Sequence, residues 1–324
     1  MTARVILLDP VTSYRLDMFR KLLPEGMEFE GAPDASPETQ MDAIRRATFA
    51  ITGGVPVTPE MMRAGAASGL KAVHKWGVGY DNIAIDVARD MGVRVLRTTG
   101  ANAQAVAETA LGLILALQRN LIAGHVALQA GVWAKGQLSP SCTLIHRKTI
   151  GLIGLGAIGT ALARMLRGFG AGRVLYAKPN ALSPEQEAEL GVTRATIEEV
   201  LTQSDVISLH CALTPETARL INAAAIARMK PGAFLINTAR GGVIDEAAVI
   251  AGVASGQLAG VALDVYDEEP LPPTSPLIGK PGIILTPHLS ALARENAESS
   301  ILRMLRNFQD VGAGRAPAEL DVVV

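Results

Sequence analysis

The stretch Thr149–Gly159 reads T-I-G-L-I-G-L-G-A-I-G, and it decides the fold of this chain. Gly154, Gly156 and Gly159 form the pattern G-x-G-x-x-G after an apolar run typical of a strand, and a helical run, Ala161–Phe169, follows. In a dinucleotide-binding βαβ unit these glycines allow a tight turn, a close approach of backbone to pyrophosphate, and packing of helix on strand. The N-terminus of the helix supplies N–H groups for the phosphates. The stretch therefore predicts a dinucleotide-binding domain, and a glycine-rich turn without a ligand is the alternative.

Strand-like and helical runs alternate along the whole chain. Before the glycine motif, the strand-like runs are Val5–Leu8, Phe49–Thr52, Ala72–Lys75 and Val93–Leu96, and the helical runs are Tyr14–Leu23, Pro59–Ala67 and Ile83–Asp90. From the motif onward, the strand-like runs are Ile150–Ile153, Val174–Ala177, Val206–Leu209, Phe234–Asn237, Val261–Leu263 and Ile283–Thr286. This alternation predicts parallel sheets covered by helices, and the six later strands fit two mononucleotide-binding halves.

The length of the chain and the order of these runs predict an α/β fold with two domains. A chain of 324 residues is long enough for two domains, and the glycine motif begins only after an apparent first domain. We expect a long, weakly charged helix over Ala103–Leu121, with Asn102 as its N-cap. A last helix, over about Arg294–Val311, is expected to cross back to the first domain. Two connections between the domains would make a hinge with a cleft, where ligands commonly bind.

The composition argues against several classes of function. The formal net charge of −1 gives no reason to expect binding to nucleic acid or to an anionic membrane. The longest apolar run, Ala110–Leu117, is too short to span a bilayer, and the first residues, M-T-A-R-V-I-L-L-D, resemble a strand rather than a signal peptide. Cys142 and Cys211 have neither the number nor the spacing of a disulfide framework or a metal site. We expect unreactive thiols, no metal and a cytoplasmic location.

Three ionisable residues follow strand ends in the second half of the chain. Arg240 ends the run L-I-N-T-A-R, Glu269 lies in D-V-Y-D-E-E-P, and His288 closes I-L-T-P-H. They would meet in one crevice, because the carboxyl ends of parallel strands line the ligand site. An arginine can clamp the carboxylate of a 2-oxo acid, and a histidine can protonate its carbonyl oxygen as hydride arrives at carbon. A carboxylate beside the histidine keeps the imidazolium populated near neutral pH. The alternative is two surface charges and a structural histidine.

Over essentially its full length the chain resembles the D-isomer-specific 2-hydroxyacid dehydrogenases. The stretches that carry the resemblance are K-W-G-V-G-Y-D-N-I (75–83), G-A-N-A-Q-A-V-A-E-T-A-L (100–111), G-L-I-G-L-G-A-I-G (151–159), S-D-V-I-S-L-H (204–210), K-P-G-A-F-L-I-N-T-A-R-G-G-V-I-D (230–245), A-L-D-V-Y-D-E-E-P-L (262–271) and T-P-H (286–288). The resemblance implies a Rossmann-type doubly wound parallel sheet over residues 101–289. It also implies a flavodoxin-like substrate domain made of residues 1–100 and 290–324, an active site between the domains, and a homodimer built around the nucleotide domain.

The resemblance assigns roles to particular residues. It implies that the arginine, the histidine and the glutamate above are the substrate-binding residue, the acid/base and the carboxylate partner of the acid/base. Val78 and Gly79 would offer backbone N–H groups to the substrate carboxylate. Asp264 would hydrogen-bond the nicotinamide carboxamide. The residues implied to bind the cofactor are Gly154, Gly156, Ala157, Ile158, Gly159, Lys178, Thr238, Ala239 and Asp264.

The chain departs from the family at the end of the second strand of the nucleotide domain, which reads V-L-Y-A-K-P. NAD-using members usually carry an acidic residue where Lys178 stands, and its carboxylate binds the adenosine ribose hydroxyls and repels a 2′-phosphate. A lysine can pair with that phosphate instead. The expected cofactor is therefore NAD or NADP, with NADP favoured, and a solvated lysine beside NAD is the alternative.

The expected reaction is reversible hydride transfer between NAD(P)H and a small 2-oxo acid, giving a D-2-hydroxy acid. The loop Gly53-Gly54-Val55-Pro56 carries no charge, which favours an unphosphorylated acid such as glyoxylate or hydroxypyruvate. Two alternatives stay open. One is a dehydrogenase of the same family acting on 3-phosphoglycerate or phosphite, and the other is a non-enzymatic NAD(H)-sensing binding protein, as the family's transcriptional corepressors show.

Overall fold

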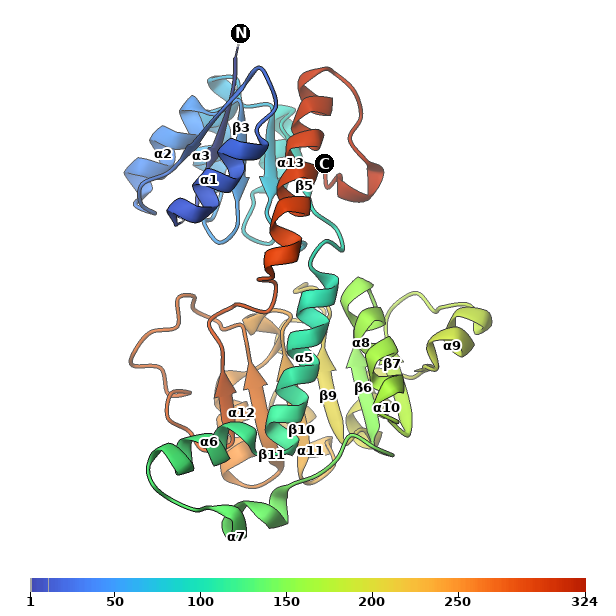
Figure 1. The fold of residues 1–324 in the computed structure, drawn as a ribbon. Coiled ribbons are helices and arrows are strands. Elements are labelled where there is room, and N and C mark those ends of the chain that lie inside the picture. The colour runs from blue at the N-terminus through green and yellow to red at the C-terminus, as the bar shows by residue number, and fades with distance from the viewer. Residues whose placement is uncertain (1, 11) are drawn as a thin grey trace. The chain divides into compact units, whose positions relative to one another are not determined.

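The computed structural model describes residues 2–10 and 12–324, and it divides into two compact units (Figure 1). The first unit contains the chain up to Asn102 together with Leu292–Val324, and the second contains Ala103–Ala291. Met1, the first residue of the expected N-terminal strand, lies outside the described residues. Each unit is built on its own parallel sheet, which confirms the predicted α/β fold class.

Five parallel strands form the sheet of the first unit, in the order β2-β1-β3-β4-β5. Their bounds are β1 Ala3–Leu7, β2 Met27–Gly31, β3 Phe49–Thr52, β4 Ala72–Lys75 and β5 Arg94–Arg97. This is the flavodoxin-like order. The sequence analysis missed β2, because Glu28 and Glu30 give this partly buried edge strand a polar pattern.

Helices cover both faces of this first sheet. The side chains of α2 Pro37–Arg46, α3 Pro59–Ala67 and α4 Ile85–Met91 pack on one face, and those of α1 Ser13–Leu22 and α13 Arg294–Gly312 pack on the other. Ser36 and Thr58 cap α2 and α3, each followed by a proline at the start of the helix, although α2 was not predicted. Ile301, Met304 and Phe308 of α13 are fully buried in this unit, so the last helix packs on its sheet.

Seven parallel strands form the sheet of the second unit, in the order β12-β11-β10-β9-β6-β7-β8. Their bounds are β6 Thr149–Ile153, β7 Arg173–Ala177, β8 Thr193–Arg194, β9 Val206–Leu209, β10 Ala233–Asn237, β11 Leu258–Leu263 and β12 Ile283–Leu285. Taken from β8 to β11, this is the doubly wound order 3-2-1-4-5-6, and β12 adds a seventh strand. All six predicted strands are present. The prediction that these six strands form the two mononucleotide-binding halves is wrong, because β12 lies outside the two halves. The third strand of the first half is β8, whose two residues are exposed and carry no apolar signal.

Helices also cover both faces of the second sheet. The helices α5 Ala103–Gln118 and α8 Ala157–Gly168 pack on one face, and α10 Ile197–Gln203, α11 Ala223–Arg228 and α12 Glu246–Ala254 pack on the other. The remaining segments are α6 Leu121–Gln129, α7 Lys135–Leu138, α9 Pro184–Leu190 and the short 3₁₀ turns Ser139–Ser141, Gly241–Val243 and, in the first unit, Glu319–Asp321.

The single helix expected over Ala103–Leu121 is wrong, and so is its cap. Asn120 has a left-handed backbone (φ 52°), which ends the right-handed α5, and α6 continues at an angle of 63°. The Oδ1 atom of Asn102, which a cap would use, is buried without a hydrogen-bond partner.

Among the described residues no single helix is long and apolar enough to cross a membrane, and the bent pair α5 and α6 meets that test by length and composition only.

Candidate active site

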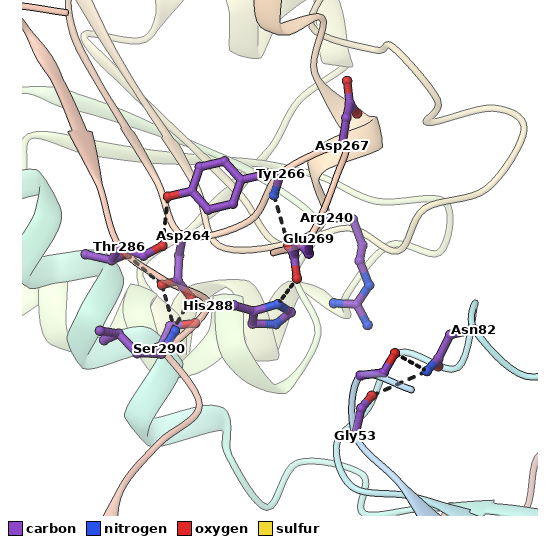
Figure 2. A network of polar contacts seen from close by, with 12 residues as sticks. Gly53, Asn82, Arg240, Asp264, Tyr266, Asp267, Glu269, Thr286, His288 and Ser290 are labelled. Atoms are coloured by element: carbon purple, nitrogen blue, oxygen red, sulfur yellow. Dashed lines mark hydrogen bonds and ion pairs between the residues drawn. The ribbon is translucent and has the colours of Figure 1, made fainter. Parts of the chain in front are cut away.

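Three neighbouring strands of the second unit end at one edge of its sheet and carry the predicted catalytic residues. Arg240 follows β10, Glu269 follows β11 and His288 follows β12. His288 Nδ1 lies 2.5 Å from Glu269 Oε2, and Glu269 Oε1 accepts the N–H of Tyr266 at 2.9 Å (Figure 2). The guanidinium of Arg240 lies beside this pair (Figure 2). The structure thus brings together the three ionisable residues that the sequence singled out.

The Glu269 carboxyl is held in its ionised form. Burial of this carboxyl favours the neutral form, but the hydrogen bonds from His288 and from the Tyr266 N–H outweigh it. The positive charges of His288 and Arg240 add to them, and together they lower the pKa of Glu269 below its usual value. An anionic Glu269 in contact with Nδ1 orients the imidazole and leaves Nε2 as the nitrogen that can exchange a proton with a ligand.

His288 occupies a left-handed backbone conformation (φ 47°) that a buried carboxylate supports. Asp264 is fully buried, and its two oxygens accept the Thr286 hydroxyl at 2.6 Å and the N–H groups of Leu289 and Ser290, both at 2.9 Å. The His288 N–H donates to the backbone carbonyl of Asp264, also at 2.9 Å. The carboxylate therefore clamps the turn that presents the imidazole. The sequence analysis expected Asp264 only as a contact of the nicotinamide carboxamide, a role that stays a prediction.

The turn that carries Arg240 is built by a buried asparagine and a glycine. Asn237, fully buried at the end of β10, donates to the Arg240 carbonyl at 2.9 Å and accepts the Ala239 N–H at 3.0 Å. A Cβ at Gly241 would lie 1.9 Å from the carbonyl carbon of Tyr266, so only glycine lets the β10 and β11 loops touch. The sequence analysis missed Asn237 as a site residue, although it stands inside the family stretch L-I-N-T-A-R-G-G.

The glycine motif forms a cradle at the same edge of the sheet. Gly154 has φ +96°, and a Cβ there would lie 2.6 Å from the backbone of His210 and Cys211. A Cβ at Gly159 would lie 2.6 Å from the Gly154 carbonyl, whereas nothing lies within 4 Å of a Cβ at Gly156. Gly156 is the N-cap of α8 and has no side chain to cap it, so the first N–H groups of this twelve-residue helix are left for a ligand. This geometry fits the pyrophosphate of a dinucleotide.

Buried polar atoms without a partner lie on two of the loops at this edge. Thr238 Oγ1 and His210 Nδ1 are buried and have no hydrogen-bond partner. The Nε2 atom of His210 lies 2.9 Å from the Ser208 hydroxyl. Burial lowers the pKa of His210 to about 4, so this imidazole is neutral at pH 7 and does not donate a catalytic proton. Unpaired buried groups are costly, and a bound ligand that pairs with them removes that cost. Thr238 was predicted to line the cofactor site, whereas His210 was not singled out.

Two cations flank the loop after β7. Lys178 follows the strand directly, and Arg194 on the neighbouring β8 donates to the Pro179 carbonyl at 3.2 Å. Tyr176 of β7 pairs in register with Arg194. The sequence analysis found only the lysine, because Arg194 lies on the strand that it missed.

Val78 and Gly79 belong to the first unit, in the loop that follows β4. Gly77 has φ +140°, and its carbonyl accepts the N–H of Thr98 at 3.1 Å, which fixes the start of the loop. The Val78 carbonyl lies 3.5 Å from Nη1 of Arg97. That Val78 and Gly79 bind a substrate carboxylate stays a prediction. Within residues 2–10 and 12–324, no group of three or more His, Cys, Asp or Glu side chains could hold a metal ion.

The chain is similar to known proteins in both its sequence and its fold. Residues 111–290 match the model of the D-isomer specific 2-hydroxyacid dehydrogenase, NAD binding domain. A hydroxypyruvate reductase of Thermotoga maritima is 38% identical over 265 residues, which cover 80% of each chain. A D-3-phosphoglycerate dehydrogenase of a Synechocystis species is 33% identical over 316 residues, or 96% of this chain and 54% of that protein. The chain thus spans about half the length of the phosphoglycerate dehydrogenases that it matches.

A solved structure shows the same fold. The NAD-dependent formate dehydrogenase of Staphylococcus aureus, solved in complex with NAD, superposes with a TM-score of 0.88 at 26% identity, and 99% of each chain is covered. The family model covers more than half of this chain, and the reductase relative is matched over most of its length. The chain belongs to the D-isomer-specific 2-hydroxyacid dehydrogenases.

Proposed function

We propose that this protein reversibly transfers hydride between NAD(P)H and a small 2-oxo acid, with a D-2-hydroxy acid as the reduced product. The observation that carries the proposal is the contact between His288 and Glu269 at the carboxyl edge of the second sheet, with Arg240 beside it. A proton donor, its anionic partner and a carboxylate-binding cation are the groups that reduction of a 2-oxo acid requires.

His288 is the proposed general acid for reduction. Its Nδ1 is in contact with Glu269, so the proton for the carbonyl oxygen comes from Nε2. Glu269 stays anionic through the reaction, because the hydrogen bonds that it accepts lower its pKa, and it stabilises the imidazolium. In the oxidative direction the neutral imidazole takes the hydroxyl proton back.

Arg240 is the proposed substrate clamp. A guanidinium can bind a carboxylate through two parallel hydrogen bonds and orient the adjacent ketone. Asn237 and Gly241 fix the turn that holds Arg240, so the side chain starts from a rigid backbone. Val78 and Gly79 of the first unit are proposed to offer their backbone N–H groups to a substrate carboxylate.

The cradle of Gly154, Gly156, Ala157, Ile158 and Gly159 would hold the pyrophosphate of the cofactor, and Thr238 and Ala239 would line its nicotinamide end. When bound, the nicotinamide supplies or accepts the hydride. The chain contributes N–H groups at the start of α8 and the buried Thr238 hydroxyl, which has no other partner.

NADP is the proposed preferred form of the cofactor. Lys178 stands where a carboxylate would bind the ribose hydroxyls of NAD, and the nearby Arg194 provides a second cation. A phosphate ester is well matched by a lysine and an arginine that flank one loop. The Lys178→Glu variant should move the ratio of kcat/KM for NADPH to that for NADH by tenfold or more towards NADH. An unchanged ratio would make Lys178 a bystander.

We also propose that the protein is a cytoplasmic homodimer. The exposed apolar side chains of α6 and of the chain that follows it support the dimer. No residue of α6 is buried, although its side chains are mostly apolar. The exposed large apolar residues of this segment are Leu121, Ile122, Val126, Leu128, Val132, Trp133 and Leu144. Exposed apolar surface of this extent is typical of a protein interface. Light scattering should give a dimer for the native chain and a monomer for a Trp133→Glu variant; a monomeric native chain would contradict the proposal.

The experiment that tests the function follows oxidation of NADPH and NADH with glyoxylate, hydroxypyruvate, pyruvate, 2-oxoisocaproate and phenylpyruvate. Turnover of a small unphosphorylated acid is expected. Turnover of 3-phosphoglycerate or of phosphite, without turnover of the small acids, would favour the alternative in which the enzyme acts on one of those two substrates. The name of the Synechocystis relative supports 3-phosphoglycerate. Cofactor binding without turnover of any acid would favour the NAD(H)-sensing alternative.

A further inference from the structure

The strand order of the first unit indicates where its sheet would bind a ligand. In a parallel sheet, ligands bind beyond the carboxyl ends of the strands, at the point where successive strands lie on opposite sides of the first. Here β1 lies between β2 and β3, so this point falls between the loops that follow β1 and β3. Asp9 lies in the first of these loops, and Gly53, Gly54 and Val55 form the second.

Asp9 fills the place that an anionic ligand would take on the second loop. Its Oδ2 accepts the N–H of Gly53, and its Oδ1 accepts the N–H groups of Gly54 at 2.5 Å and Val55 at 3.1 Å. Successive N–H groups that point to one spot form a concave anion-binding site. In this chain the anion in that site is the protein's own carboxylate.

The opposite side of the same loop is also engaged. The Asn82 amide donates to the Gly53 carbonyl at 3.4 Å (Figure 2). It also donates to the carbonyls of Gly54 and Val55 at 3.3 and 3.1 Å. The ammonium of Lys75, a residue only 8% exposed, donates to the Gly53 carbonyl and to Asn82 Oδ1. The Lys75 ammonium is thus bound to a carbonyl of this loop, whereas Asp9 is bound to its N–H groups.

The two glycines keep the carboxylate close to the loop. A Cβ at Gly53 would lie 3.3 Å from Asp9 Oδ1, which is tighter than ordinary contacts, and a Cβ at Gly54 would lie 3.5 Å away. Gly53 and Gly54 therefore present backbone without a side chain, and the N–H groups of the loop are paired with a negative charge. A second anionic group on a ligand would find repulsion there instead of donors.

We propose that Asp9 is a specificity-determining residue, which rejects 2-oxo acids that carry a phosphate or a second carboxylate. This inference rests on the proposed function and narrows its substrate class to acids with an uncharged side chain. Asp9 acts by occupying the N–H groups of Gly53–Val55 and by its charge. It touches no reacting atom.

The test compares two substrates that differ by one phosphate group, hydroxypyruvate and its 3-phosphate. The native protein should have a kcat/KM at least a hundredfold higher for hydroxypyruvate. The Asp9→Asn variant keeps the shape of the side chain and removes its charge, so this preference should fall tenfold or more, mainly through a lower KM for the phosphorylated acid. Inorganic phosphate should inhibit this variant competitively and leave the native protein unaffected.

Two further variants make the result decisive. Asp17→Asn removes an exposed carboxylate of α1 that pairs with Arg20, so it matches the charge change, and it should keep the native preference. Gly54→Arg places a cation where a Cβ has ordinary contact distance to Asp9, and it should lower the preference by tenfold or more. This second route remains open if Asp9→Asn fails to fold, which thermal unfolding would reveal.

The possible failures are distinguishable. A native protein that reduces the phosphorylated acid as well as hydroxypyruvate overturns the role of Asp9 and leaves the dehydrogenase function standing. Equal losses for both substrates in Asp9→Asn, or an unchanged preference in the folded variants, show a purely structural carboxylate and also overturn it. No turnover of any acid with either cofactor overturns the proposed function itself, and this inference with it.

Discussion

The two units of this protein carry parallel sheets of related topology, but their carboxyl edges are equipped differently. In the second unit the loops present ionisable side chains, Arg240, Glu269 and His288, and buried polar groups fix the turns that carry them. In the first unit the loop Gly53–Val55 presents backbone, and Asp9 and Asn82 hold it from its two sides. The same architecture thus carries the proposed catalytic residues in the second unit and the proposed specificity-determining residue in the first.

Both edges use a carboxylate to fix a loop through backbone N–H groups. Asp264 holds Leu289 and Ser290, and it is fully buried with no exposure of its own. Asp9 holds the glycine loop but stays partly exposed. Asp264 positions the turn that carries His288, whereas the partly exposed Asp9 can also repel an anionic ligand through its charge.

A large loss of activity is expected when the proposed substrate-binding residue of the second unit, Arg240, is changed. Arg240→Lys should lower kcat/KM for the best 2-oxo acid by about 10²–10³, because a lysine cannot form the two parallel hydrogen bonds of a guanidinium. Steady-state kinetics measures this loss. Arg219→Lys, which changes a half-exposed arginine paired with Asp267 in the same unit, is the control and should stay near native activity. Comparable losses in both variants would contradict a special role for Arg240.

A smaller effect is expected from the partner of the acid. Glu269→Gln should lower the rate of reduction by about ten- to a hundredfold, because a neutral partner no longer stabilises the imidazolium. Steady-state kinetics of reduction measures this loss.

The matched control for this change is Glu246→Gln. Glu246 also accepts a backbone N–H, that of Asp267 at 2.9 Å, but it does not contact His288. The rate of reduction in this variant should stay near native. A native rate in Glu269→Gln would show that the contact with His288 has no part in proton transfer.

The smallest expected effect is on the pH dependence of the free energy of unfolding. One buried histidine in each unit should contribute to it in the same direction. Burial lowers the pKa of His74 in the first unit and of His210 in the second, each from 6.5 to about 4. Between these values the unfolded chain binds protons that the folded chain does not, so the free energy of unfolding falls as pH falls from 6.5 to 4. Each histidine contributes a slope of at most about 1.4 kcal/mol per pH unit.

Removing either buried imidazole tests that symmetry. His74→Asn and His210→Asn should each flatten the pH dependence of stability in this range, measured by urea unfolding at several pH values. His146→Asn, at an exposed histidine, is the control and should keep the native slope. A native slope in both buried-histidine variants would contradict the burial argument.

The strongest periodic signals of the sequence predicted most of the fold. Phe49–Thr52, Ala72–Lys75 and Val206–Leu209 are strands with the expected bounds, and every residue in these three short runs is buried. The edge strands β2 and β8 were missed because their residues are exposed or alternate with glutamate. The break at Asn120 was missed because a left-handed residue inside an apolar helical run leaves little mark on periodicity.

The candidate site was predicted where side chains follow strand ends, and missed where function depends on an internal contact. Arg240, Glu269 and His288 were found in this way, and the structure brings them together. Nothing in the local sequence around Asp9 or Asn237 reveals what these side chains bind. Their contacts are set by loops that lie far apart in the chain or by a turn that only the folded backbone defines.

The most direct test of the account is replacement of the acid itself. His288→Ala should lower kcat with the best 2-oxo acid by 10² to 10⁴ while the dissociation constant for NADPH, measured by fluorescence titration, stays within about threefold of native. His146→Ala, at an exposed histidine of the same unit, should retain native turnover. Native turnover in the folded His288→Ala variant would contradict the claim that the second unit performs its chemistry through this imidazole.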